Sequence, residues 1–232
     1  MDYVVLDLEW NQASDSRDAR NRLLTFEIIE IGAVKLNSRM EIVDTFEELI
    51  RPQVYDTMHH ITEKLIGIHM KDLSGCRTFD VVMKDFLAWC GEDFMFGTWG
   101  PQDLTELQKN MRFFGMEPLG KGPVRFYDIQ KLFSIAYEDQ KVRRSLEYAV
   151  DYLQIPKDIP FHRAISDAVY TARVFQMIKD PIALQRVSFD TFQLPENHRS
   201  EVHVVFDNYA KYISRPAPPY RRHRCSRPVS YT

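Results

Sequence analysis

The first apolar run of the chain, residues 3–10, reads YVVLDLEW and is the feature that most constrains the fold. Its β-branched, aromatic and leucine side chains are typical of a buried strand. Side chains two residues apart on a strand point to the same face, so Asp7 and Glu9 are predicted to project side by side from the strand end. Two like charges held there are costly without a cation between them, and a divalent metal with oxygen ligands is the usual solution.

The pair alone is a weak signal, because any acidic strand that leaves a core has the same pattern. It gains meaning only where further acids converge on it. A metal site therefore requires further carboxylates from elsewhere in the sequence that the fold brings to the same place.

Composition indicates a globular protein with a sizeable core, since 44% of the 232 residues are hydrophobic and 27% are charged. No apolar run approaches the roughly 20 residues of a membrane span, and the N-terminus runs directly into a strand without a signal-peptide pattern. We therefore expect no membrane association. Cys76, Cys90 and Cys225 are scattered without metal-site spacing, which predicts a reducing, cytoplasmic location.

Charge is unevenly distributed along the chain. The six lysines and arginines from residue 208 onward, with no acid among them, give that segment +6 and leave −9 for residues 1–207, out of a total of −3. The basic segment also contains prolines and tyrosines. Two interpretations stay open: a tail that binds a polyanion such as single-stranded nucleic acid, or a solvated tail with no such role.

The order of elements predicts an α/β domain. Antiparallel strands joined by short turns come first, and strands alternating with helices follow, so we expect a mixed five-stranded sheet, three antiparallel strands and then parallel strands, flanked by helices. The expected strands cover residues 3–10, 26–36, 41–46, 94–99 and 124–128, and the main helices follow Asp103, Asp128, Ser145 and His162. The predicted domain spans residues 1–180, and residues 181–232 form a C-terminal extension.

Three further residues fall where they can join Asp7 and Glu9. Asp103 follows the end of a predicted sheet strand at the start of a helix, where ligand sites in such sheets gather. Asp167 lies on a late helix, and His162 lies five residues earlier, just before that helix begins. The sequence thus predicts one cluster of four carboxylates with a histidine at its rim.

Carboxylate oxygens suit Mg²⁺ or Mn²⁺, and four negative charges roughly balance two divalent ions. Two such ions are a known device for phosphodiester cleavage, in which one activates a water and the other stabilises the leaving 3′-oxygen. A histidine beside them is a suitable general base for that water. The prediction is therefore a metal-dependent phosphodiester hydrolase.

The chain resembles the DEDDh-type 3′–5′ exonucleases, which include RNase T and the proofreading subunit of bacterial DNA polymerase III. Their first motif is matched by VLDLE at residues 5–9, the second by TWGPQD at residues 98–103, and the third by FHRAISDA at residues 161–168. Residues 28–33, IIEIGA, are also family-like. The motif sequences are most similar to those of the branch that contains the histone-mRNA exonucleases and the sporulation-inhibitor KapD-like proteins.

This resemblance implies an RNase H-like fold, two Mg²⁺ or Mn²⁺ ions, and release of 5′-mononucleotides from a 3′ end. It also implies that Asp7, Glu9, Asp103 and Asp167 are the metal ligands and that His162 is the general base. Leu8, Glu9, Trp10 and His162 are the implied contacts to the terminal nucleotide.

Two positions allow alternative interpretations. Trp10 either stacks on the last base or packs in the core, and Glu30 is either a site residue or a hydrogen-bonded structural glutamate. Trp99 is interpreted as packed beneath the site.

The leading functional hypothesis is a 3′–5′ exonuclease acting on the 3′ ends of single-stranded RNA or short oligonucleotides, with DNA as a further substrate class. One alternative is a nucleic-acid-binding module that has lost activity, which four uncompensated carboxylates would only destabilise. The other is a polymerase-associated proofreading subunit. The sequence does not identify a protein partner.

Overall fold

This computed structural model describes residues 1–190 except 16, 121, 140 and 179. The basic tail predicted from residue 208 therefore lies outside the described residues, as does most of the predicted extension. The strands are β1 (Asp2–Asn11), β2 (Glu27–Leu36), β3 (Ile42–Leu49), β4 (Phe94–Thr98), β5 (Arg125–Asp128) and β6 (Ser188–Phe189). The helices are the 3₁₀ helix η1 (Ala19–Arg22) and α1 (His60–Ile66), α2 (Met70–Leu73), α3 (Phe79–Cys90), α4 (Gln102–Phe113), α5 (Ile129–Tyr137), α6 (Leu146–Tyr152), α7 (Ala164–Met177) and α8 (Pro181–Leu184).

The strands form one mixed sheet in the order β3-β2-β1-β4-β5-β6. β1, β2 and β3 pair in antiparallel fashion, while β4 and β5 continue the sheet in parallel with β1. This confirms the predicted mixed α/β sheet. The predicted count of five strands is wrong by one, because two residues beyond the predicted domain, Ser188 and Phe189, pair antiparallel with β5.

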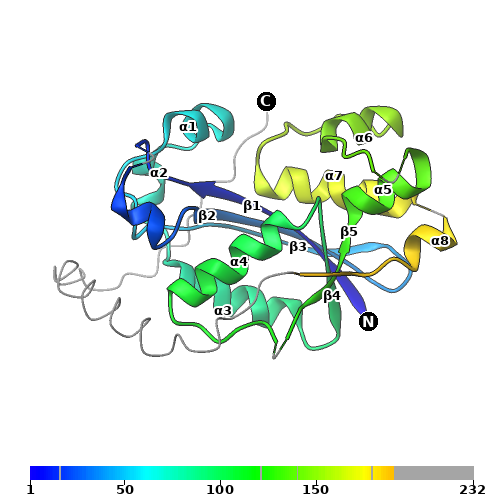
Figure 1. The fold of residues 1–232 in the computed structure, drawn as a ribbon, viewed down its shortest axis with the longest axis horizontal. Helices are drawn as coiled ribbons and strands as arrows, with labels where there is room; N and C mark the ends of the chain where they lie inside the picture. Colours follow the sequence, from blue (N-terminus) through cyan, green and yellow to red (C-terminus); the bar gives the residue numbers. More distant parts are fainter. Residues whose placement is uncertain (16, 121, 140, 179, 191–232) are drawn as a thin grey trace.

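Alternation along β1 separates two hydrophobic layers. Val4, Leu6 and Leu8 face the cluster built with α3 and α4, whereas Val5 faces the cluster built with α5, α6 and α7. Figure 1 shows these two groups of helices on opposite sides of the sheet. Because side chains alternate along a strand, residues 7 and 9 share the face of Val5, which α7 covers.

Helix α7 lies very close to β2. A Cβ at Gly32 would overlap the backbone of Ala164 and Ile165, so only glycine permits this approach. The first turn of α7 is therefore pressed against the middle of the sheet, beside the end of β1.

The described part of the chain contains no helix that is both long and apolar enough to cross a bilayer. Cys76 and Cys90 are buried. The cytoplasmic location stays a prediction.

Candidate active site

β1 delivers the first two carboxylates. Asp7 lies opposite Gly32 in the β1–β2 ladder and Glu9 lies opposite Glu30, and the register of the ladder shifts directly after Glu9. Both side chains are half-buried and project on the side of α7. The geometry matches the prediction that they lie side by side at the end of an apolar strand.

Helix α4 provides the third carboxylate. Asp103 lies in the first turn of α4 and is almost fully buried. Its Oδ1 accepts a hydrogen bond from the backbone N–H of Leu8, over 3.3 Å, which ties α4 to β1 between Asp7 and Glu9. Gly100, with φ of +92°, makes the turn between β4 and α4, a conformation that favours glycine. The carboxylate is thus held against β1 by its own helix start.

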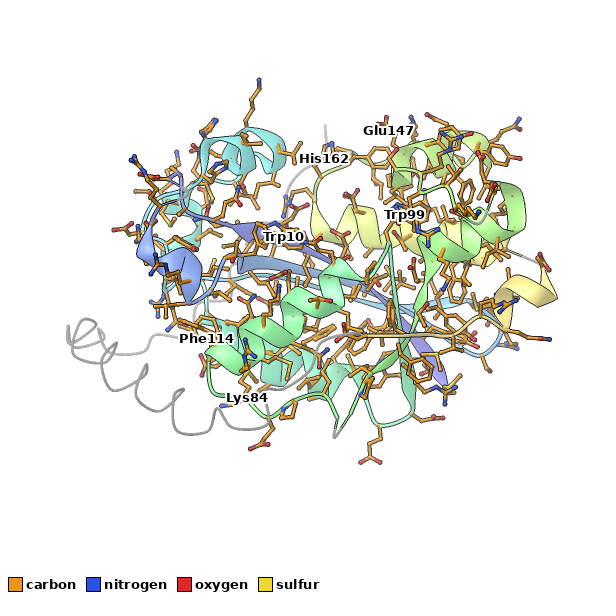
Figure 2. All side chains as sticks on the ribbon, in the orientation of Figure 1. Trp10, Lys84, Trp99, Phe114, Glu147 and His162 are labelled. Atoms are coloured by element: carbon orange, nitrogen blue, oxygen red, sulfur yellow. The ribbon has the colours of Figure 1, made fainter. Side chains whose placement is uncertain are left out.

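α7 delivers Asp167 and, just ahead of the helix, His162. The backbone N–H of His162 donates to both carboxylate oxygens of Asp167, over 3.3 and 3.4 Å. His162 itself is exposed and has a φ of +68°, in the left-handed region. Figure 2 shows His162 in the segment that leads into α7, while Trp10 lies on β1.

Three of the predicted ligands form a metal-sized group. One carboxylate oxygen from each of Asp7, Glu9 and Asp167 lies within 4.8 Å of the others. Asp103 is not one of these three, but among the neighbouring charges its charge has the largest effect on the pKa of Asp7. All four predicted acids therefore act on the same small volume.

The burial and mutual repulsion of the carboxylates favour a bound cation. Burial raises the pKa of Asp7 well above its ordinary value, and the charges of Asp103, Glu9 and Asp167 raise it further. Burial, and then the neighbouring charge of Glu30, raise the pKa of Glu9 to about 8. Burial also raises the pKa of Asp103, and it raises that of Asp167 to about 6. A hard divalent cation among these oxygens would favour their ionised forms, so the residues present fit such an ion.

The predicted substrate contacts occupy different environments. The side chain of Leu8 is buried in the core and its N–H is bonded to Asp103. Trp10 is half-buried and packs on Phe26, with ring centroids 5.4 Å apart. Both alternatives for Trp10 therefore stay open, and substrate contact by either residue stays a prediction.

Trp99 is packed, as predicted. Its indole N–H donates to the carbonyl oxygen of Arg144 over 3.2 Å, and its ring lies against Phe133. Trp99 therefore contributes to the packing beside the start of α4.

Sequence reasoning missed Arg163, and it left Glu30 with two interpretations. Glu30 is fully buried and forms an ion pair with Arg163, which directly follows His162. A signal was present, because a glutamate inside an apolar run needs a partner when it is buried. Nothing local in the sequence indicates which of the many arginines that partner is.

Comparison with protein families places the chain among nucleases. The exonuclease model RNase_T matches residues 4–175, which include every predicted ligand and His162. The chain belongs to the RNase_T exonuclease family. The predicted DEDDh-type resemblance is confirmed, and divalent metal ions are the cofactors that this family uses.

Two curated relatives illustrate the range of the RNase_T family. The PolC-type DNA polymerase III of Caldanaerobacter subterraneus is 27% identical over 174 residues, which cover 75% of this chain and 11% of the polymerase. The 3′-5′ exoribonuclease 1 of Homo sapiens is 24% identical over 171 residues, which cover 68% of this chain and 48% of that protein. The chain thus spans less than half the length of either relative.

Solved structures confirm the RNase H-like exonuclease fold. The nuclease domain of 3′hExo, a DEDDh family member bound to rAMP, superposes with a TM-score of 0.64 at 21% identity, covering 81% of this chain and 96% of that one. A 3′-exonuclease described in 3′-end recognition of a histone mRNA stem-loop has a TM-score of 0.67 at 19% identity, with 84% and 72% covered. This RNase_T member therefore shares the fold of exonucleases that act at 3′ ends.

Proposed function

We propose that the protein is a metal-dependent 3′–5′ exonuclease that releases 5′-mononucleotides from single-stranded nucleic acid. The observation that carries the proposal is the group of Asp7, Glu9 and Asp167, whose oxygens lie within 4.8 Å of one another beside the buried Asp103. Burial and mutual repulsion raise the pKa values of these carboxylates, so ionising them without a metal costs free energy. A protein that only binds nucleic acid would gain nothing from that cost.

In this proposal, Asp7, Glu9, Asp103 and Asp167 hold two divalent ions, Mg²⁺ or Mn²⁺. Bound ions would supply a water of lowered pKa and charge stabilisation for the leaving 3′-oxygen. The protein's own contribution is to place the oxygens, because β1, α4 and α7 each hold carboxylates in position. Asp103 does so through the N–H of Leu8, and Asp167 does so through the N–H of His162.

His162 is the proposed general base. Its backbone is bonded to the ligand Asp167 while its side chain stays exposed, so the imidazole is free to reach a water at the rim of the cluster. Trp10 and the backbone around Leu8 and Glu9 are the proposed contacts to the terminal nucleotide. An aromatic ring there provides a stacking surface that tolerates any base.

RNA is the favoured substrate class. The human relative is named an exoribonuclease, and the similar structures include one with rAMP and one concerned with a histone mRNA end. DNA is the second class, supported by the likeness to PolC-type polymerases, in which case the activity would be proofreading.

The test is a time course with 5′-labelled single-stranded RNA and DNA of one sequence, in Mn²⁺, with a matched set blocked at the 3′ end. We expect a ladder that shortens from the 3′ side, faster for RNA, and no shortening of blocked strands or in EDTA. Cleavage of blocked strands would overturn the proposed polarity. Binding without any cleavage would support the binding-module alternative.

A further inference from the structure

The ion pair between Glu30 and Arg163 is unusually well excluded from water. Glu30 is 0% exposed, and the Arg163 side chain is 18% exposed. The Arg163 Nε donates to Glu30 Oε1 over 2.9 Å, and Nη2 donates to the same oxygen over 2.7 Å. Burying two charges carries a desolvation cost that such contacts only partly repay, so the pair is not explained by stability alone.

The same glutamate also caps α7. The N-cap position of this helix is Arg163, whose side chain makes no capping hydrogen bond. In its place, Glu30 Oε2 accepts from the backbone N–H of Ala164 over 3.4 Å. Glu47 on β3 adds a second carboxylate, 3.3 Å from Arg163 Nη2. A carboxylate at a helix N-terminus is electrostatically favourable, so two strands jointly fix where α7 begins.

His162 is the residue directly before this anchor. Its φ of +68° is uncommon for a residue other than glycine and persists only where the surroundings hold it. On one side its N–H is bonded to Asp167, and on the other its chain continues into Arg163, whose side chain is bonded to Glu30. The hydrogen bond to Asp167 and the anchored Arg163 therefore fix the backbone of His162, and with it the direction of the imidazole.

We propose that Glu30 and Arg163 are positioning residues that hold His162 at the rim of the carboxylate cluster. They act through the backbone of residues 162–164 and do not touch substrate. This inference rests on the proposed function, because it assumes that His162 is the general base.

The chain offers a matched control on the same helix. Arg173 forms an ion pair with Asp158 that is also made by two guanidinium nitrogens, ten residues further along α7. That pair is more exposed, with 28% of the arginine and 55% of the aspartate side chain accessible, and it does not adjoin His162. Exposed pairs contribute little to stability.

The experiment compares Arg163→Lys with Arg173→Lys. Lysine keeps the charge but loses the planar fork that reaches Glu30 and Glu47. On single-stranded RNA in Mn²⁺ we expect Arg163→Lys to lower kcat by roughly tenfold, since small misplacements of catalytic groups are costly, while KM changes less than about twofold. Arg173→Lys should change neither.

Repeating the substitution in a His162→Ala background shows whether Arg163 affects kcat through His162. If Arg163 acts through His162, then Arg163→Lys should change the residual kcat of the His162→Ala protein by less than about twofold. An undiminished tenfold loss in that background would overturn the inference, because it would show a general structural effect. Glu47→Gln, a milder change at the outer contact, should lower kcat in the same direction by about two- to threefold if Arg163→Lys does not fold.

Amide hydrogen exchange tests the anchor without turnover. We expect faster exchange at residues 162–167 in Arg163→Lys and Glu47→Gln, and unchanged exchange there in Arg173→Lys. Unchanged exchange in all three variants would show that the ion pair does not hold this segment. Wild-type protein that cleaves no substrate would refute the proposed function, and the exchange result would still decide whether the pair fixes His162.

Discussion

At the scale of single residues, the site is defined by acids whose surroundings oppose their ionisation. Asp7 has the most extreme environment, because burial and four neighbouring carboxylates all raise its pKa. Such a residue makes the fold less stable when it ionises without a cation, and strongly shifted pKa values of this kind are typical of functional sites. The effect of Asp7 on stability and its effect on activity can be measured separately in a variant that loses only the charge.

Asp7→Asn should therefore lower kcat by at least about a thousandfold, because a lost metal ligand costs several kcal/mol of transition-state stabilisation. In EDTA at pH 8 its melting temperature should be equal to or higher than that of the wild type, since one repelling charge is gone. Kinetics on single-stranded RNA and thermal unfolding measure the two effects. Asp2→Asn on the same strand is the control and should leave kcat unchanged; near-normal turnover by Asp7→Asn in Mn²⁺ would contradict the ligand assignment.

At the scale of elements, the decisive contact is between β2 and α7. Gly32 lets the first turn of α7 approach the sheet, and Glu30, two residues earlier on β2, holds that turn through Arg163. β2 therefore sets the height of the helix above the sheet, and together with Glu47 on β3 it sets the point where the helix begins. Asp167 and His162 inherit their positions from that contact.

Gly32→Ala tests the contact, because the added methyl group would overlap the backbone of Ala164 and Ile165. We expect unfolding free energy to fall by about 1–3 kcal/mol, the usual cost of overpacking, and kcat to fall along with it as α7 is displaced. Denaturant unfolding and single-stranded RNA kinetics provide the measurements. Gly75→Ala, where a Cβ meets nothing within 4 Å, should leave both unchanged. A Gly32→Ala enzyme with full activity would show that α7 need not sit this close.

At the scale of the whole molecule, the sheet brings four separated acids into one volume and so links stability to pH and metal. The raised pKa of Glu9, about 8 against an ordinary 4.5, means that the folded state holds more protons than the unfolded state between those values. Without metal, stability is therefore lost as pH rises through that window, as the carboxylates of the cluster are forced to ionise. A divalent ion bound among these oxygens would remove this penalty.

We therefore expect the melting temperature of EDTA-treated protein to fall between pH 5 and pH 8, and to fall less in Asp7→Asn. Millimolar Mn²⁺ should raise it by several degrees at pH 8 and by little at pH 5, where protons occupy the same oxygens. Scanning calorimetry across this range checks both statements. A Mn²⁺ shift that is as large at pH 5 as at pH 8 would show that protons and metal do not compete at this cluster.

Much of the site was predictable because it depends on short-range rules. The parity of β1 places Asp7 and Glu9 on one face, and a helix start after a strand end places Asp103 at the sheet edge. The roles of His162 and Asp167 came from the motif of residues 161–168. None of these needed knowledge of distant contacts.

The tertiary structure alone decided which distant groups meet. The bond between Glu30 and Arg163 joins residues 133 positions apart, and the sixth strand pairs Ser188 and Phe189 with β5 across about sixty residues. Sequence patterns report the face and period of each element, but partner choice depends on how whole layers pack, and packing is a property of the folded chain. The sequence by itself therefore determined which residues we propose to carry the chemistry, while the packing of α7 on β2 decided where the segment with His162 lies.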